Sequence, residues 1–246
     1  MEMGFMFTDE LKNIVDDAEN IVFFGGAGVS TGSGIPDFRG SGGIYTADDD
    51  ADESPETILS GKYLCRYPEK FFAYYKTHMI YPDAEPNDAH YALVELERCG
   101  KLKAVITQNV DGLHQVAGSQ NVIELHGSVM RNYCTHCGKE YSLSYVLNCY
   151  NVPRCEICGS VVRPDVVLYG EWIDGESFAK AEKAISEADV LIVGGTSLTV
   201  QSAASLIDLF QCEHLILVNQ TPTPYDGYAE YIIREPIEDV LRELMA

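Results

Sequence analysis

The stretch that decides the fold is residues 23–39, with the sequence FFGGAGVSTGSGIPDFR. The apolar run at 21–24 is typical of a buried parallel strand, and it passes directly into Gly25, Gly26 and Gly28. Glycines at such a point let the backbone turn sharply and approach a ligand closely. A glycine-rich turn between a strand and a helix also offers free N–H groups to a phosphate. The stretch therefore predicts a dinucleotide-binding α/β fold.

The same loop departs from an ordinary dehydrogenase fingerprint. Thr31 stands where the third glycine of G-x-G-x-x-G would be, and Pro36 with further glycines excludes a long helix. The loop instead continues into a polar and aromatic segment that ends in Asp37, Phe38 and Arg39. This pattern indicates a site in which the nicotinamide end of a dinucleotide undergoes something other than hydride transfer.

The rest of the chain alternates between short apolar runs and amphipathic segments. We expect helices over 8–20, 63–80, 87–99, 178–187, 202–210 and 237–245, and further strands over 104–107, 122–125, 166–168, 190–193 and 215–218. Such alternation predicts a Rossmann-like, doubly wound parallel sheet. Five strand ends carry small or polar side chains, and the carboxyl ends of parallel strands meet at one edge. The sequence therefore predicts a single ligand crevice at that edge.

Four cysteines form two C-x-x-C pairs, Cys134 with Cys137 and Cys155 with Cys158, separated by seventeen residues. This spacing is typical of a tetrahedral zinc ribbon, and a glycine after each pair permits the tight turn that such a site needs. Four thiolates fill the coordination sphere, so we expect one structural Zn²⁺ without catalytic function. A redox dithiol is the alternative interpretation, and two matched pairs fit it poorly.

The length of 246 residues allows one large and one small domain. We expect a Rossmann-type NAD-binding domain over 1–129 and 165–246 and a small inserted zinc-ribbon module over 130–164. Part of 40–80 is expected to be a helical and lid portion of the small domain, including the acidic stretch at 48–53.

The chain carries 17 basic and 38 acidic residues, a formal charge of −21. This balance argues against a nucleic-acid or anionic membrane partner. It is compatible with lysine-rich protein segments, although solubility alone also explains it. No run approaches the ~20 apolar residues of a membrane span, and no secretory signal is visible at the N-terminus. We therefore expect a cytoplasmic protein.

His126 is the candidate general base because it follows a predicted strand and imidazole titrates near working pH. Asn109 and Asp111 follow the neighbouring predicted strand, opposite His126. Structural alternatives exist for each residue. A lone histidine is often structural, Asn-Val-Asp-Gly is good turn sequence, Phe38 could belong to a core, and Arg39 could pair with the acidic stretch.

Several motifs occur together in one order along nearly the whole chain. They are the loop at 25–40, QNVDGLH at 108–114, LHGS at 125–128, the four cysteines, RPDVVLYGE at 163–171, GTSLTV at 195–200 and VNQ at 218–220. Together they closely resemble the motifs of bacterial-type sirtuins, the NAD-dependent protein deacylases. The resemblance implies a Rossmann-type large domain, a small zinc-binding domain and an acetyl-lysine tunnel between them.

The resemblance also implies roles for individual residues. The implied NAD contacts are Ala27, Thr31, Phe38, Arg39, Gln108, His126, Thr196, Ser197, Asn219 and Ile237. The implied nicotinamide pocket consists of Ile35, Asp37, Asn109, Val110 and Asp111. The implied substrate strand, which would pair with the peptide backbone, consists of Val167, Leu168, Tyr169 and Gly170. The implied catalytic residues are His126, Asn109 and Asp111.

The activity implied by the resemblance is NAD-dependent deacetylation of protein lysines by a monomer. The acetyl-lysine oxygen attacks the ribose carbon as nicotinamide leaves, and His126 then deprotonates a ribose hydroxyl, which leads to lysine and O-acetyl-ADP-ribose. In relatives that prefer succinyl groups, a Tyr-x-x-Arg pair holds the acyl carboxylate. We align that pair to Phe72 and Tyr75, and the missing cation predicts acetyl and longer apolar acyl groups.

Two other functions remain open from the sequence. A mono-ADP-ribosyltransferase would use the same ribose chemistry with a different nucleophile, and an NAD-sensing binding module would bind the dinucleotide without turnover. An ordinary dehydrogenase is disfavoured because the third glycine and the ribose-binding acid are missing.

Overall fold

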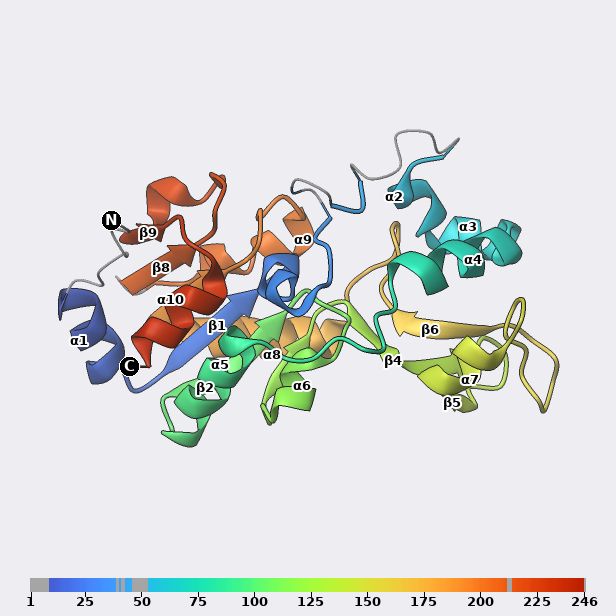
Figure 1. Ribbon diagram of the computed structural model, residues 1–246, viewed down its shortest axis with the longest axis horizontal. Helices are drawn as coiled ribbons and strands as arrows, with labels where there is room; N and C mark the ends of the chain where they lie inside the picture. Colours follow the sequence, from blue (N-terminus) through green and yellow to red (C-terminus); the bar gives the residue numbers. More distant parts are fainter. Residues whose placement is uncertain (1–8, 39, 41–42, 46–52, 212–213, 246) are drawn as a thin grey trace.

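The computed structural model describes residues 9–38, 40, 43–45, 53–211 and 214–245 (Figure 1). The predicted NAD contact of Arg39 and most of the predicted acidic lid, residues 48–52, lie outside these ranges. Among the described helices, none combines the length and the apolar character that a membrane crossing needs.

A six-stranded, fully parallel sheet forms the larger part of the molecule. Its strands are β1 (Ile21–Gly25), β2 (Leu102–Thr107), β3 (Val122–Glu124), β7 (Val190–Gly194), β8 (His214–Val218) and β9 (Tyr231–Ile233). Their spatial order, β3-β2-β1-β7-β8-β9, is that of a doubly wound fold, which confirms the predicted class. The strand order reverses between β1 and β7, where such sheets bind ligands.

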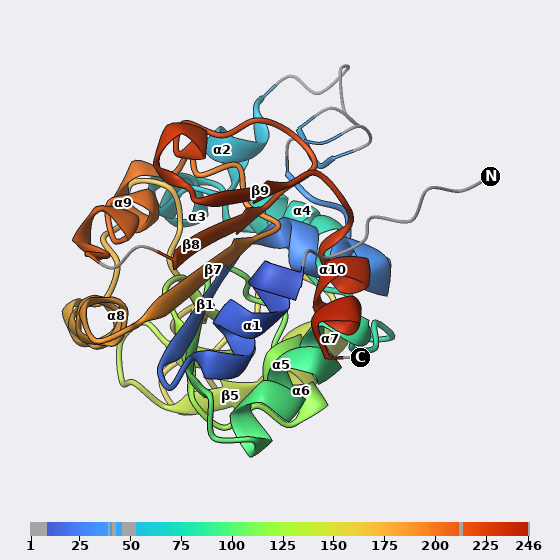
Figure 2. The same cartoon turned by 90° about the vertical axis from the view of Figure 1, so that its left-hand side faces the viewer.

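Helices cover both faces of this sheet (Figure 2). Successive side chains of a strand point to opposite faces, so Ile21 and Phe23 join one core while Val22 and Phe24 join another. The helices are α1 (Asp9–Asp17), α5 (Asp88–Arg98) and α10 (Ile237–Leu244) on the first face, and α8 (Gly175–Ser186), α9 (Gln201–Ala204) and the 3-10 turn η3 (Ile207–Leu209) on the second. A short helix α6 (Leu113–Ala117) follows β2, and the turn η4 (Asp226–Tyr228) precedes β9.

A smaller unit lies beside the sheet, on the right of Figure 1. It contains an antiparallel sheet in the order β5-β4-β6, made of β5 (Glu140–Ser142), β4 (Gly127–Cys134) and β6 (Val162–Val166). Its helices are α2 (Pro55–Ile58), α3 (Gly61–Arg66), α4 (Pro68–His78) and α7 (Leu143–Asn148). Aromatic side chains of α4 pack with Cys134, Cys155 and Val162 in a third core. The helices and the cysteine-bearing strands therefore share one hydrophobic interior.

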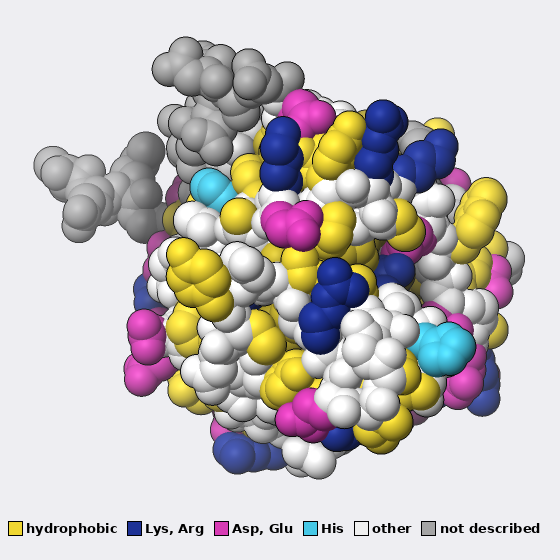
Figure 3. All heavy atoms as spheres, turned by 90° about the vertical axis from the view of Figure 1, so that its right-hand side faces the viewer, with side chains coloured by type: hydrophobic (Ala, Val, Ile, Leu, Met, Phe, Trp, Pro, Cys, Tyr) yellow, Lys and Arg dark blue, Asp and Glu magenta, His cyan; other side chains and the backbone are white. Residues whose placement is uncertain are grey.

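The outer face of this smaller unit carries Lys, Arg, Asp and Glu side chains interspersed among apolar ones (Figure 3). The two signs of charge alternate over the face, rather than gathering into one basic area of the kind that binds a phosphate backbone.

Some predicted elements differ from the structure. The prediction that 166–168 belongs to the main sheet is wrong, because β6 ends at Val166 and pairs antiparallel with β4. Gly127 makes this pairing possible: its φ is +74°, and a Cβ there would lie 2.0 Å from the carbonyl oxygen of Asp165. The predicted helix at 63–80 is two helices, because Pro68 starts a new one after Tyr67. The predicted helix at 202–210 is α9 followed by η3, and the three-residue β9 escaped prediction.

Two buried histidines face each other between α5 and α6. His90 and His114 are 0% and 1% exposed, and their ring centroids lie 4.7 Å apart. Burial lowers the pKa of His90 to about 4. Burial, with the neighbouring His90, lowers the pKa of His114 to about 3. Both imidazoles are therefore neutral in the folded protein at pH 7.

This pair makes stability depend on pH. Below pH ~6.5 the unfolded chain protonates both histidines, whereas the folded chain does not until about pH 4 and 3. The stability is thus fully present above pH ~6.5 and is lost as the pH falls, by about 2 kcal/mol per histidine between pH 6.5 and 5. Urea unfolding at several pH values measures this loss.

The matched variant is His90→Gln. The Nδ1 of His90 accepts the Asn87 N–H at 3.2 Å, and glutamine at the same helical position forms the usual capping box. In this variant we expect the unfolding free energy to depend less steeply on pH, by the equivalent of about one bound proton. The cysteine thiols also titrate on acidification, so the two proteins are compared at each pH. An unchanged slope would contradict the neutral state of His90.

Candidate functional site

The glycine-rich loop after β1 packs directly against the end of the neighbouring strand β7, at the place where the strand order reverses. It forms two 3-10 turns, η1 (Ala27–Val29) and η2 (Thr31–Ser33), in place of a long helix, as the sequence predicts. The N–H of Gly28 donates to the carbonyl oxygen of Gly195 at 2.8 Å. A Cβ on Gly28 would lie 2.7 Å from the Gly195 Cα, so this contact requires glycine. The close approach brings the polar residues after β1 and β7 to one place.

A cavity of about 990 Å³ lies over this place. That volume is at the upper end of small-molecule and cofactor sites, and it suits an extended ligand such as a dinucleotide. It is lined by all the described residues to which the sequence assigns a cofactor or substrate contact: Ala27, Thr31, Ile35, Asp37, Phe38, Gln108, Asn109, Val110, Asp111, His126, Val167, Leu168, Tyr169, Gly170, Thr196, Ser197, Asn219 and Ile237. Residues from both sheets and from α10 therefore face one space.

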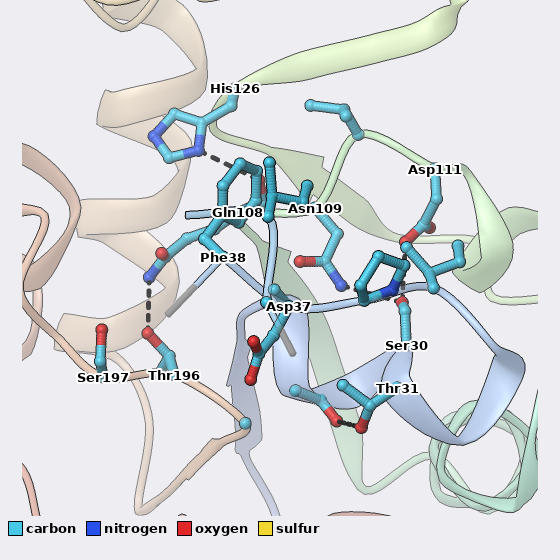
Figure 4. A pocket seen from close by; sticks show the side chains of 18 of the residues that line it. Ser30, Thr31, Asp37, Phe38, Gln108, Asn109, Asp111, His126, Thr196 and Ser197 are labelled. Atoms are coloured by element: carbon cyan, nitrogen blue, oxygen red, sulfur yellow. Dashed lines mark hydrogen bonds between the residues drawn. The ribbon is translucent and has the colours of Figure 1, made fainter. Parts of the chain in front are cut away.

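His126 lies between β3 and β4, at the border of the two sheets. Its Nδ1 is 3.0 Å from the carbonyl oxygen of Gln108 (Figure 4). A carbonyl oxygen only accepts, so Nδ1 carries the proton and Nε2 keeps a lone pair. Burial lowers the pKa of His126, and the hydrogen bond to Gln108 opposes that shift. The imidazole is therefore neutral at pH 7 and able to accept a proton at Nε2.

Ser30 links the two polar residues that follow β2. Its hydroxyl donates to Asp111 Oδ2 at 2.7 Å and accepts from Asn109 Nδ2 at 3.0 Å (Figure 4). The second oxygen of Asp111 accepts the Leu113 N–H at 2.9 Å. Burial raises the pKa of Asp111, and these two hydrogen bonds partly offset the rise. Sequence reasoning missed Ser30, because a serine inside a glycine-serine loop carries no signal of its own.

The remaining predicted NAD contacts sit on strand ends that are fixed by local hydrogen bonds. Gln108 donates from Nε2 to Thr196 Oγ1 at 3.3 Å, which joins the end of β2 to the end of β7 (Figure 4). Asn219, after β8, donates from Nδ2 to the carbonyl oxygen of Thr221 at 2.8 Å. Thr31 donates its hydroxyl to the carbonyl oxygen of Gly28 at 2.9 Å. Hydroxyl and amide groups thus rim the cavity at three strand ends.

Several backbone groups of the predicted substrate strand, residues 167–170, already form hydrogen bonds within the protein. Val167 N–H donates to the His126 carbonyl oxygen at 3.0 Å, and Tyr169 N–H donates to that of Leu59 at 3.0 Å. The Tyr169 carbonyl oxygen accepts the Gly61 N–H at 3.3 Å. One edge of the segment is therefore paired with the residues that precede α3.

An ion pair between Arg163 and Glu171, one before and one after the same segment, holds it in place. Arg163 donates from Nη1 and Nη2 to the two carboxylate oxygens of Glu171 at 2.7 and 2.8 Å, and Nη2 also donates to the Val166 carbonyl oxygen at 2.9 Å. Glu171 Oε2 in turn accepts the Leu168 N–H at 3.0 Å. Burial acts to raise the pKa of Glu171, and its hydrogen bonds from Arg163 and Leu168 outweigh burial and lower it. This bracket fixes both ends of the segment.

The cofactor loop and the substrate segment also meet through tyrosines. The hydroxyl of Tyr45 contacts that of Tyr169, and the Tyr45 ring packs edge-on to Phe38 with centroids 5.6 Å apart. The Tyr169 hydroxyl makes a contact that phenylalanine at this position could not make.

The C-terminal end of α4 supplies another wall of the cavity, together with Ile44 and Leu59. Tyr75 and His78 line it, whereas Phe72 is 1% exposed and packs in the third core. Of the two positions aligned to the acyl-selecting pair of other sirtuins, the structure therefore places only Tyr75 at the cavity.

The four cysteines of the C-x-x-C pairs come together in the smaller unit. Their Sγ atoms all lie within 4.8 Å of one another, with Cys134 and Cys158 at 3.4 Å and Cys137 and Cys155 at 3.5 Å. A tetrahedral Zn²⁺ with Zn–S bonds of about 2.3 Å holds its sulfurs about 3.8 Å apart, so the cluster fits this metal. Tyr141 donates its hydroxyl to the Cys155 sulfur at 3.2 Å, which orients a prospective ligand.

Comparison with known proteins agrees with this geometry. A model of the Sir2 family matches residues 26–202. The NAD-dependent protein deacetylase of Clostridium acetobutylicum is 51% identical over 238 residues, which cover 96% of this chain and 97% of that protein. The NAD-dependent protein deacetylase of Clostridium perfringens is 50% identical over 238 residues, covering 96% and 98%.

Solved structures agree as well. A Sir2 complex with a p53 peptide and NAD⁺ matches with a TM-score of 0.87 and 35% identity, covering 98% of both chains. A Sir2 complex with deacetylated p53 peptide and 3′-O-acetyl-ADP-ribose matches with a TM-score of 0.89 and 36% identity, again over 98% of both chains. On the family match and on relatives about half identical over nearly its whole length, this chain belongs to the Sir2 family.

Proposed function

We propose that this chain is an NAD-dependent protein-lysine deacetylase, which converts acetyl-lysine, NAD and water into lysine, nicotinamide and O-acetyl-ADP-ribose. The observation that carries the proposal is the single cavity that the cofactor loop, His126 and the segment 167–170 line together. The names of the two Clostridium relatives and the ligands of the two Sir2 complexes support it.

In this proposal His126 is the general base. Its Nδ1 proton is held by the Gln108 carbonyl oxygen, so Nε2 takes the proton from a ribose hydroxyl that attacks the acyl group. The bond to Gln108 also fixes the orientation of the ring and stabilises the imidazolium that forms. His126 is partly buried, which limits the access of water to the reacting acyl group and so protects it from early hydrolysis.

Asn109, Asp111 and Ser30 hold the nicotinamide end. Nicotinamide carries a carboxamide, which offers both donors and an acceptor to the amide of Asn109 and the carboxylate of Asp111. Ser30 fixes these two side chains relative to each other, so the pocket is preorganised before the ligand arrives. Phe38, Thr196, Ser197 and the other predicted contacts bind the rest of the dinucleotide.

The substrate peptide runs along residues 167–170 as an added strand, and the acetyl-lysine side chain enters the cavity between the two sheets. The module over 130–164 binds one Zn²⁺ through the four cysteines. That metal stabilises the module and has no open coordination position, so it takes no part in the reaction.

Product identification tests the proposal. The protein is incubated with NAD and an acetyl-lysine peptide, and the products are analysed by mass spectrometry. We expect nicotinamide, the peptide lighter by one acetyl group, and O-acetyl-ADP-ribose in equal amounts. ADP-ribose attached to protein would instead indicate a mono-ADP-ribosyltransferase. NAD binding without turnover of any acyl peptide would indicate an NAD-sensing module.

A further inference from the structure

The two 3-10 turns of the glycine-rich loop, η1 and η2, have a side that faces the cavity and a side that faces the protein interior. Ser30 and Thr31 line the cavity (Figure 4), whereas Val29 and Ser33, on either side of them, do not. Val29 is 0% exposed, so its carbonyl oxygen cannot turn to solvent for a hydrogen-bond donor. A group inside the protein must therefore satisfy it, because a buried carbonyl without a partner is costly.

Asn87, the residue that caps the N-terminus of α5, reaches this interior side of the loop. Its Nδ2 donates to the Val29 carbonyl oxygen at 2.8 Å and to the Ser33 hydroxyl at 3.1 Å. Its Oδ1 accepts the Ala89 N–H at 3.0 Å, so both ends of the amide are in use and its orientation is fixed. One side chain thus joins both turns of the loop to the start of α5.

The packing around Gly32 shows how closely the second turn rests on its support. A Cβ on Gly32 would lie 3.2 Å from Asn87 Nδ2 and 3.0 Å from Glu238 Oε1 of α10. Helices α5 and α10 pack into the same core, so the turn lies against a well-packed base. On the cavity side of the same loop, the Ser30 hydroxyl donates to Asp111. The support behind the loop therefore helps to place a residue of the nicotinamide pocket.

Resting on the NAD-dependent function proposed above, we propose that Asn87 is a positioning residue for the dinucleotide. It is not among the described residues that line the cavity, so it acts through the loop. Its two donated hydrogen bonds hold η1 and η2 in the conformation that receives NAD before the ligand arrives. Without them that conformation is populated for a smaller fraction of the time, and the apparent affinity for NAD falls by the same factor. The reaction of bound NAD, which depends on His126, is unchanged.

Asn87→Asp and Asn87→Ser test this role, because both keep an oxygen that caps α5 and remove the amide that donates to the two turns. Asn87→Ser also lacks the negative charge that Asn87→Asp introduces. In calorimetry we expect the Kd for NAD to rise about tenfold in each variant, the equivalent of one hydrogen bond. With an acetyl-lysine peptide, KM for NAD should rise, while kcat at saturating NAD and KM for the peptide stay unchanged.

Ser142→Ala is the matched control for the loss of a helix cap. Ser142 caps α7 in the smaller unit by accepting the Tyr145 N–H at 3.3 Å, and it is not among the cavity-lining residues that the structure describes. We expect this variant to lower the urea midpoint and to keep the wild-type Kd for NAD. It thereby separates a general loss of stability from a loss of NAD binding.

A wild-type Kd for NAD in both Asn87 variants would overturn the proposal. A raised Kd in Asn87→Asp alone would also overturn it, because the introduced charge, rather than the lost donors, would be the cause. Weaker NAD binding in both variants, in a protein whose wild type turns over no acetyl-lysine peptide, would support the role of Asn87 and refute the deacetylase function. A wild type that does not bind NAD would refute both.

Discussion

His126→Ala is expected to lower kcat for consumption of NAD with an acetyl-lysine peptide by about 10²–10⁴-fold, the usual contribution of a general base. The side chain is partly buried, and among the described residues its hydrogen bond is to the Gln108 carbonyl oxygen, so its removal leaves both sheets intact. We expect the variant to retain NAD binding in calorimetry. We also expect it to retain exchange of labelled nicotinamide into NAD, because nicotinamide departs before the base acts in the proposed sequence.

The pH dependence gives a second measurement of the same role. The base must be neutral, and burial lowers the pKa of His126 below its usual 6.5. The acidic limb of kcat/KM for the wild type should therefore lie below pH 6.5 and disappear in His126→Ala.

His214→Ala is the control, because His214 is outside the cavity and pairs with Glu230 at the surface. It should leave product formation unchanged. Activity of His126→Ala near that of the wild type would remove His126 from the mechanism.

Loss of the proposed zinc ion is expected to be the largest single effect on stability. Structural zinc sites contribute on the order of 10 kcal/mol in small zinc-finger peptides. Here the proposed ligands Cys134 and Cys155 also pack into the same core as Phe72 and Tyr75. We therefore expect a chelator, or Cys155→Ser, to unfold the antiparallel sheet and to remove the cavity wall formed by α4 and β6.

Three measurements monitor the loss of the zinc ion. Mass spectrometry of the metal should give one zinc per chain in the wild type and less in Cys155→Ser, urea unfolding should shift to lower concentration, and deacetylation should be lost. Cys99→Ser is the matched control, since Cys99 is exposed and lies outside the cluster. A Cys155→Ser protein with full metal content and an unchanged urea midpoint would contradict the assignment.

The parts of the fold that follow from local sequence were predictable. The strand before Gly25 and the absence of a long helix after it depend on residues next to each other in the chain, and so does the C-x-x-C spacing. The six-stranded sheet could be anticipated in class, yet its last strand could not, because three residues at 231–233 carry too short a pattern.

Pairing partners were harder to predict than elements. The apolar residues at 166–168 favour an extended chain, but their pattern does not tell which sheet they join. Pairing with β4 depends on a residue about forty positions earlier, Gly127, because its missing Cβ lets β4 approach Asp165. The link of Ser30 to Asn109 and Asp111 spans about eighty positions in the chain. Such relations exist only in three dimensions.

The bracketed segment at 167–170 has a consequence for the choice of targets. Its paired edge and the Arg163–Glu171 ion pair leave three main-chain groups without a partner among the described residues, the Val167 carbonyl and the N–H and carbonyl of Gly170. In the proposed binding mode these backbone groups recognise an extended strand but read little of its side-chain order. A client protein must therefore detach a lysine-bearing stretch from its own fold, which costs the free energy of local opening. We expect modified lysines in tails and frayed loops to be the ones that are processed, whatever their flanking residues.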